Sequence, residues 1–80
     1  MYKVISNKQT IVIRTNEVNE LNLDFDFDDF SEALDFYESY IADHAKHVGT
    51  ICATRIVHVI QLIDIFRDKT TIHYKLTLSN

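Results

Sequence analysis

The sequence predicts a small α+β domain in which one helix packs on one face of a small antiparallel β-sheet. Three observations lead to this prediction: short β-branched runs near the N-terminus, a single segment with helical periodicity at residues 29–48, and two β-rich segments after it. The expected order is strand, strand, extended acidic segment, helix, strand, strand. With 80 residues, one Gly and no Pro, we expect one domain over residues 1–80.

The N-terminal part predicts a hairpin followed by an extended segment. Tyr2–Ile5 and Thr10–Arg14 are β-branched runs, and the polar residues 6–9 between them fit a four-residue loop. Residues 21–28 then alternate strictly between apolar and polar side chains, which is typical of a strand with one side on the core. We expect Phe25 and Phe27 to anchor it. Because Asp is disfavoured in strands, we expect an edge strand or an extended loop.

The helix has defined ends. Asp29 is the expected N-cap, with Glu32 three positions later in a capping-box arrangement. The only glycine, Gly49, stands where a left-handed C-cap would need it. The predicted buried stripe is Phe30, Ala33, Leu34, Tyr37, Ile41, Ala45 and Val48. The predicted outward side is Glu32, Asp35, Ser39, Asp43 and Lys46.

The segment 53–66 is rich in β-branched residues, which favours a strand, although its apolar positions also have helical spacing. We prefer the strand because residues 71–78 alternate cleanly and residues 67–70 would form the turn of a hairpin. Both faces of this strand are apolar, whereas one helix covers one face, so we expect a symmetric homodimer through the uncovered face or the sheet edge. The predicted interface residues are Ile56, Ile60, Leu62 and Phe66.

The net charge of −4 conceals a strong segregation of charge along the chain. Residues 15–45 contain ten acids and no Lys or Arg, whereas the other 49 residues hold eight bases and two acids. An acidic chain without a Lys/Arg cluster is not expected to bind nucleic acid directly. One cysteine excludes an internal disulfide, and no apolar run fits a signal peptide or a membrane span, so we expect a cytoplasmic protein.

Metal and enzyme motifs are weak. Asp24, Asp26 and Asp28, with Glu32 and Asp35 at the ninth and twelfth positions, resemble an EF-hand loop, but Asp29 occupies the glycine position and the twelfth residue is not Glu. A calcium-binding module is therefore a minor alternative. His44, His47 and Cys52 lack a fourth ligand for zinc, and His58 and His73 fit sheet-surface roles. We predict no enzyme, no metal and no cofactor.

The acidic segment is the candidate binding surface. On an extended chain alternate residues lie about 6.6 Å apart, and phosphates on one DNA strand are separated by on the order of 6–7 Å. A row of carboxylates at this interval, continued by the helix, would compete with DNA for a basic groove. The predicted contact residues are Asp24, Asp26, Asp28, Asp29, Glu32, Asp35, Glu38 and Asp43.

In size and charge layout, residues 21–43 resemble the DNA-mimic inhibitors made by bacteriophages, which share no sequence motif. The resemblance implies a homodimer in the cytoplasm of the host cell. Its partner would be a basic host protein that binds DNA, either an HU-like nucleoid protein or a defence, repair or transcription protein. The alternative is a structural protein that assembles head to tail through complementary acidic and basic faces.

Overall fold

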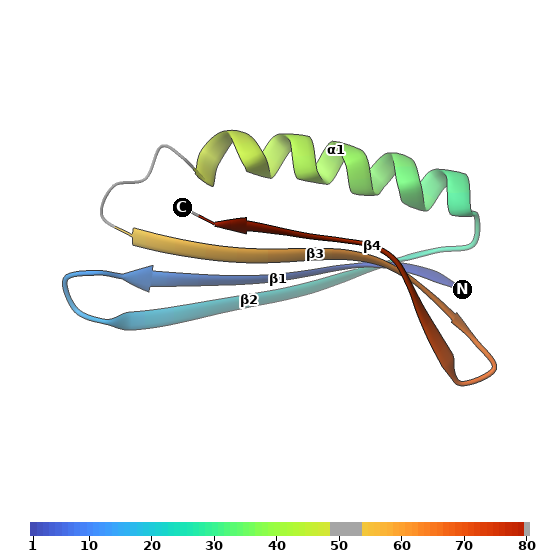
Figure 1. Cartoon of the computed structure of the whole chain (residues 1–80), viewed down its shortest axis with the longest axis horizontal. Coiled ribbons are helices and arrows are strands. Elements are labelled where there is room, and N and C mark those ends of the chain that lie inside the picture. The colour runs from blue at the N-terminus through green and yellow to red at the C-terminus, as the bar shows by residue number, and fades with distance from the viewer. Residues whose placement is uncertain (49–53, 80) are drawn as a thin grey trace.

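In the described part of the chain, four antiparallel strands form one sheet and a single helix lies across one of its faces (Figure 1). The computed structural model describes the backbone of residues 1–48 and 54–79 and the side chains of residues 1–45 and 54–79. The elements are β1 (Tyr2–Val12), β2 (Glu17–Phe27), α1 (Phe30–Val48), β3 (Thr54–Phe66) and β4 (Lys69–Ser79). The strand order is β2-β1-β3-β4. The α+β class is confirmed, and the arrangement of the first strands needs correction.

The N-terminal hairpin differs from the prediction because residues 6–9 are not a loop. They lie inside β1, and the hairpin joins β1 to β2 through residues 13–16, where Asn16 has a φ of 59°. The four polar side chains alternate between the two faces of the sheet, and Ser6, Asn7 and Gln9 find hydrogen-bond partners there. Asn7, for example, donates from Nδ2 to Oδ1 of Asn22 on β2 at 2.8 Å. A polar run without Gly or Pro therefore continued the strand.

The acidic alternating segment is part of β2, an edge strand 11 residues long. It pairs with β1 in a register that sets Phe25 beside Val4 and Phe27 beside Tyr2. Phe25 and Phe27 pack against the core, as predicted from the alternation. Of the two predicted possibilities, edge strand and extended loop, the edge strand is confirmed.

The helix begins as predicted. The carboxylate Oδ2 of Asp29 accepts a hydrogen bond from the backbone N–H of Glu32 at 3.2 Å, which satisfies one free donor of the first turn. Ala33 and Tyr37 are buried and stand at the centre of the inward stripe. Ala45 was predicted to be buried and is exposed, because it follows the end of the apolar contact with the sheet. The predictions for Gly49 and for the side chains of Lys46 and Val48 lie outside the described residues.

The C-terminal hairpin confirms the strand prediction for β3. Its turn has two residues, Arg67 and Asp68, with φ angles of 49° and 64°, the signs that a type I′ turn requires. A β-bulge interrupts the register between Leu62 and Ile63, so that His73 and Tyr74 together oppose one residue. The turn end of the hairpin bends away from α1 (Figure 1).

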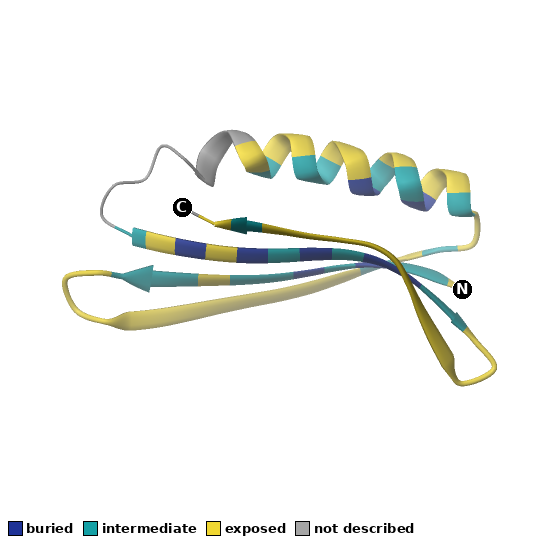
Figure 2. Ribbon diagram, viewed as in Figure 1, coloured by how far each residue is buried: buried dark blue, intermediate teal, exposed yellow. Residues whose placement is uncertain are grey.

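The predicted interface residues need correction, because three of the four lie under the helix. Ile56, Ile60 and Leu62 are 2%, 0% and 0% exposed and belong to the face that α1 covers, whereas Phe66 is 65% exposed. Both parities of β3 are apolar, so the sequence did not distinguish the covered face from the other. Burial alternates along β3 as far as Leu62 (Figure 2), and Ile63, beside the bulge, is also buried. The odd-numbered residues, among them Val57 and Val59, form the uncovered face.

Candidate acidic binding surface

The predicted acidic residues are divided between two sides of the molecule. The rings of Phe25 and Phe27 lie 4.7 Å and 5.2 Å from the ring of Phe36 on α1. Since neighbouring residues of a strand point to opposite faces, Asp24 and Asp26 point away from the helix. They lie on the uncovered face of the sheet.

Asp24 and Asp26 share one cation. The ammonium of Lys3 lies 3.5 Å from Asp24 and 3.1 Å from Asp26, whose side chains are 65% and 60% exposed. The hydrogen bond from Lys3 to Asp26 and the negative charge of Asp26 raise the pKa of Lys3 above its ordinary value, and Asp24 makes a smaller contribution. The charge of this acidic pair is therefore partly neutralised within the protein.

The remaining acids line the outer side of α1 and the turn before it. We call them the acidic ridge: Asp28, Asp29, Glu32, Asp35, Glu38 and Asp43. All six are exposed. Helical periodicity turns the four that lie on α1 away from Ala33 and Tyr37, and the axial rise from Glu32 to Asp43 is about 16 Å. Within the described part of the chain, no salt bridge joins any of the six to a base.

The single continuous row that the sequence suggested is therefore two surfaces. Strand alternation directs Asp24 and Asp26 to one side of the sheet, and the helix presents the ridge on the other. Asp29 also has a structural role, because its carboxylate caps the helix. The ridge is the larger acidic surface, and none of the described bases pairs with it.

A buried polar cluster between α1 and the sheet is a feature that the sequence analysis missed. The Oγ of Ser6 lies 2.6 Å from Nε2 of His58, and the hydroxyl of Tyr40 donates to Ser6 Oγ at 2.9 Å. The ring of His44 stacks on Tyr40 at 4.0 Å and meets His58 at 5.2 Å. Ser6 is two residues from Val4, so on one continuous strand both would point to the core. The loop predicted at residues 6–9 prevented this conclusion.

His58 is held in its neutral form. It is 1% exposed, and its burial lowers its pKa to about 4, with further contributions from the nearby charges of His44 and Lys8. Ser6 is also buried, at 2% exposed, so the Ser6–His58 pair is closed to a substrate. The cluster therefore links helix to sheet and does not form an accessible nucleophile.

The other histidines do not assemble a metal site. His73 lies against Phe30 at 5.3 Å, whereas His58 is paired with Leu78 on β4, so these two histidines do not face each other. His47 and Cys52 belong to the parts left undescribed. Over the described residues, no group of three or more His, Cys, Asp or Glu is placed to hold a metal ion. In particular, Asp24 and Asp26 lie on an extended strand beside Lys3.

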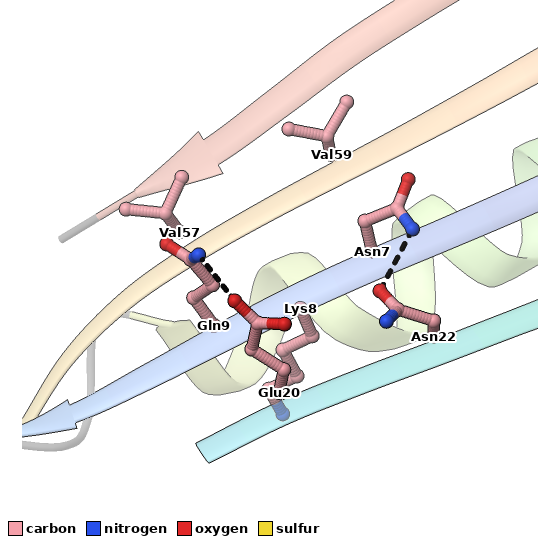
Figure 3. A pocket seen from close by; sticks show the side chains of 7 residues that line it. All are labelled: Asn7, Lys8, Gln9, Glu20, Asn22, Val57 and Val59. Carbon is pink, nitrogen blue, oxygen red and sulfur yellow. Dashed lines mark hydrogen bonds between the residues drawn. The ribbon is translucent and has the colours of Figure 1, made fainter. Parts of the chain in front are cut away.

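A shallow hollow of about 380 Å³ lies on the uncovered face (Figure 3). It is lined by Asn7, Lys8, Gln9, Glu20, Asn22, Val57 and Val59. Its polar groups bond to each other: Asn7 donates to Asn22, and Nε2 of Gln9 donates to Oε1 of Glu20 at 2.9 Å.

Comparison of the chain with protein-family models, with curated proteins and with solved structures gives no match. Among the described residues, no helix has the length and apolar character needed to cross a membrane. The acidic ridge and the uncovered face of the sheet are therefore the features from which a function can be inferred.

Proposed function

We propose that this protein is an acidic protein-binding module, a DNA-mimic inhibitor that occupies the DNA-binding surface of a basic protein through the acidic ridge. One observation carries the proposal: six exposed acids on α1 and in the turn before it have no salt-bridge partner among the described residues. An unpaired array of this kind has its field directed outward, where a basic groove would meet it.

The spacing of the ridge is compatible with a basic groove that accepts a phosphate backbone. Glu32, Asp35 and Glu38 follow one another at three-residue intervals, which is an axial step of about 4.5 Å. Phosphates along one DNA strand advance about 3.4 Å along the axis and are separated by a somewhat larger distance because of the helical rotation. Flexible Lys and Arg side chains of a partner can adapt to such a difference.

The chemistry of the ridge defines the class of partner. Basic DNA-binding proteins, such as HU-like nucleoid proteins and defence, repair or transcription proteins, present rows of Lys and Arg that the ridge would neutralise. Binding of this type weakens as salt rises. A partner that acts on DNA would place this protein in the cytoplasm of the cell in which it works.

The alternative of head-to-tail assembly requires one coherent basic face. The described basic residues are spread instead over both faces of the sheet and both hairpin turns: Arg14 lies after β1, and Arg67 lies in the β3–β4 turn at the other end of the sheet. No described surface matches the ridge in extent with the opposite sign. The distribution of charge therefore favours an inhibitor over a self-assembling protein.

A competition experiment tests the proposal. Labelled DNA bound to an HU-like nucleoid protein should be displaced by this protein, with less displacement at higher salt. D35N/E38Q removes two charges of the ridge and should raise the half-displacing concentration by roughly tenfold. The matched control E17Q/D68N removes two exposed acids away from α1 and should change it by less than about twofold.

Two outcomes would contradict the proposal. Equal losses in both variants would mean that total charge, and not the ridge, causes displacement. An absence of displacement from each of a set of basic proteins (nucleoid, repair, restriction and transcription) would remove the inhibitor assignment.

A further inference from the structure

The uncovered face of the sheet carries charges of both signs in nearly separate halves. Strand alternation places Glu20, Asp24 and Asp26 of β2 on this face, together with Lys3 of β1, Arg55 of β3 and Lys75 of β4. Within the described part of the chain, this face therefore carries three acids and three bases, whereas the ridge consists of acids alone. The acids lie along one edge of the sheet, and two of the bases lie beyond its midline.

We propose that this face binds a second copy of the chain, about a two-fold axis that runs along the strands between two stacked sheets. Given the order β2-β1-β3-β4, such an axis sets β2 of one copy over β4 of the other and β1 over β3. An axis across the strands would instead set β2 over β2 and bring acids against acids. The charge distribution favours the first arrangement.

The strand register makes the match specific. Asp24 is opposite Ile5, Ile5 is opposite Gln61, and Gln61 is opposite Lys75, so that Asp24 and Lys75 stand in one row across the sheet. Rotation about an axis along the strands keeps each row level. The partner subunit's Asp24 therefore lies over Lys75, and the two-fold axis repeats the pair. Stacked sheets lie about 10 Å apart, a gap that a Lys and an Asp side chain can span.

The hollow on this face provides a second element of complementarity. Gln9 is opposite Val57 and Asn7 is opposite Val59 in the sheet, so the same axis sets the partner subunit's Val57 over Gln9 and the partner subunit's Val59 over Asn7. Val57 is 38% exposed in the single chain. The amides that line the hollow are bonded within the chain, and covering them therefore leaves few polar groups unsatisfied.

The size of the face agrees with a stable dimer. Four strands at about 4.8 Å spacing and ten residues at about 3.3 Å give a footprint of about 600 Å² per copy. Both copies together then bury about 1,200 Å², the lower end of the range for specific interfaces. The ridges remain on the two outer sides, so this inference is independent of the proposed function.

Charge exchange at the Asp24–Lys75 row tests the dimer. Sedimentation velocity over a range of concentrations should show a dimer for the wild type, with a Kd raised on the order of tenfold or more by D24K and by K75D. The double variant D24K/K75D should return the Kd to within about threefold of the wild type. D35K makes the same charge change on the ridge and should leave the dimer intact.

Each other outcome would overturn the inference. A wild-type monomer at about 100 μM would do so directly. Sensitivity to K75D alone would indicate pairing through the β4 edge, and sensitivity to D24K alone would indicate the β2 edge. A double variant that folds, as judged by its melting temperature, but does not recover dimerisation would show that the two residues do not meet.

Discussion

The outer side of α1 and the uncovered face of the sheet differ in how their charges are arranged. The ridge is acidic throughout and has no cation beside it among the described residues. The uncovered face carries both signs, and Lys3 already pairs with two of its acids. A surface of one sign can attract only a partner of the opposite sign, whereas a surface divided between the two signs can match its own copy.

The difference also shows that neighbours in sequence can serve different surfaces. Asp26 and Glu32 are six residues apart in one acidic segment. The pleat of β2 turns Asp26 to the uncovered face, and the helix that begins at Phe30 carries Glu32 to the opposite side of the sheet. The division of the acidic segment into a self-association face and a partner-binding ridge is the hypothesis that the next experiments address.

The largest expected effect comes from a charge at the centre of the uncovered face. Val59 is half-buried there, beside Asn7 on β1. Val59→Lys would bury an unpaired charge in the dimer and should raise its Kd by about 100-fold, which is about 3 kcal/mol. Analytical ultracentrifugation gives the Kd, and the DNA competition assay on the same sample should show that the ridge still works.

The matched change on the ridge should reverse this pattern. Asp35→Lys reverses one charge at an exposed position of α1, so the dimer should persist while displacement of DNA weakens. The two surfaces would not be separate if each variant lost both dimerisation and displacement of DNA. The same would follow if Val59→Lys abolished displacement of DNA and left the dimer intact.

The stability of the packing between α1 and the sheet should fall at acidic pH because of His58. Its folded-state pKa is about 4, below the ordinary value of 6.5, because burial disfavours the charged ring. The unfolded chain therefore binds a proton more readily, and stability that is fully present above pH 6.5 is lost as the pH falls towards 4. At pH 5 the loss should be about 2 kcal/mol, measured by urea unfolding between pH 7 and 5.

Two glutamine variants isolate this effect. His58→Gln keeps a hydrogen-bonding group near Ser6 but cannot be protonated, so its stability should vary less between pH 7 and 5. His73→Gln removes an exposed histidine at the bulge and should keep the wild-type dependence. The same pH dependence in His58→Gln as in the wild type would assign the acid response to another group.

The sequence predicted most of the elements because their local signals agree with the fold. Asp29 capped the helix as expected, and the alternation at Phe25 and Phe27 predicted which side of the edge strand packs on the core. The helix stripe was correct around Ala33 and Tyr37, where the apolar period meets the sheet. Each of these features depends on residues within one or two turns of helix or one strand.

The errors arose where the answer depends on a distant strand. Nothing within residues 6–9 shows that Asn7 will find Asn22 or that Ser6 will meet His58, so the polar run resembled a loop. The two apolar parities of β3 were equivalent until the helix covered one of them. For the same reason, the division of the acidic segment between two surfaces could not be predicted without knowing which face of β2 packs on α1.

The smallest expected effect separates stability from binding within the ridge itself. Asp28 and Asp29 are adjacent and exposed, but only Asp29 accepts the hydrogen bond from the backbone of Glu32. Asp29→Ala should lower the free energy of unfolding by about 1 kcal/mol, whereas Asp28→Ala removes the same charge and should change it by less than about 0.5 kcal/mol. In the competition assay the two variants should weaken displacement equally, because a basic partner senses both charges at nearly the same position. If Asp29→Ala weakened displacement much more than Asp28→Ala did, binding of the partner would require an ordered first turn of the helix. The ridge would then act as a structured surface and not as a row of independent charges.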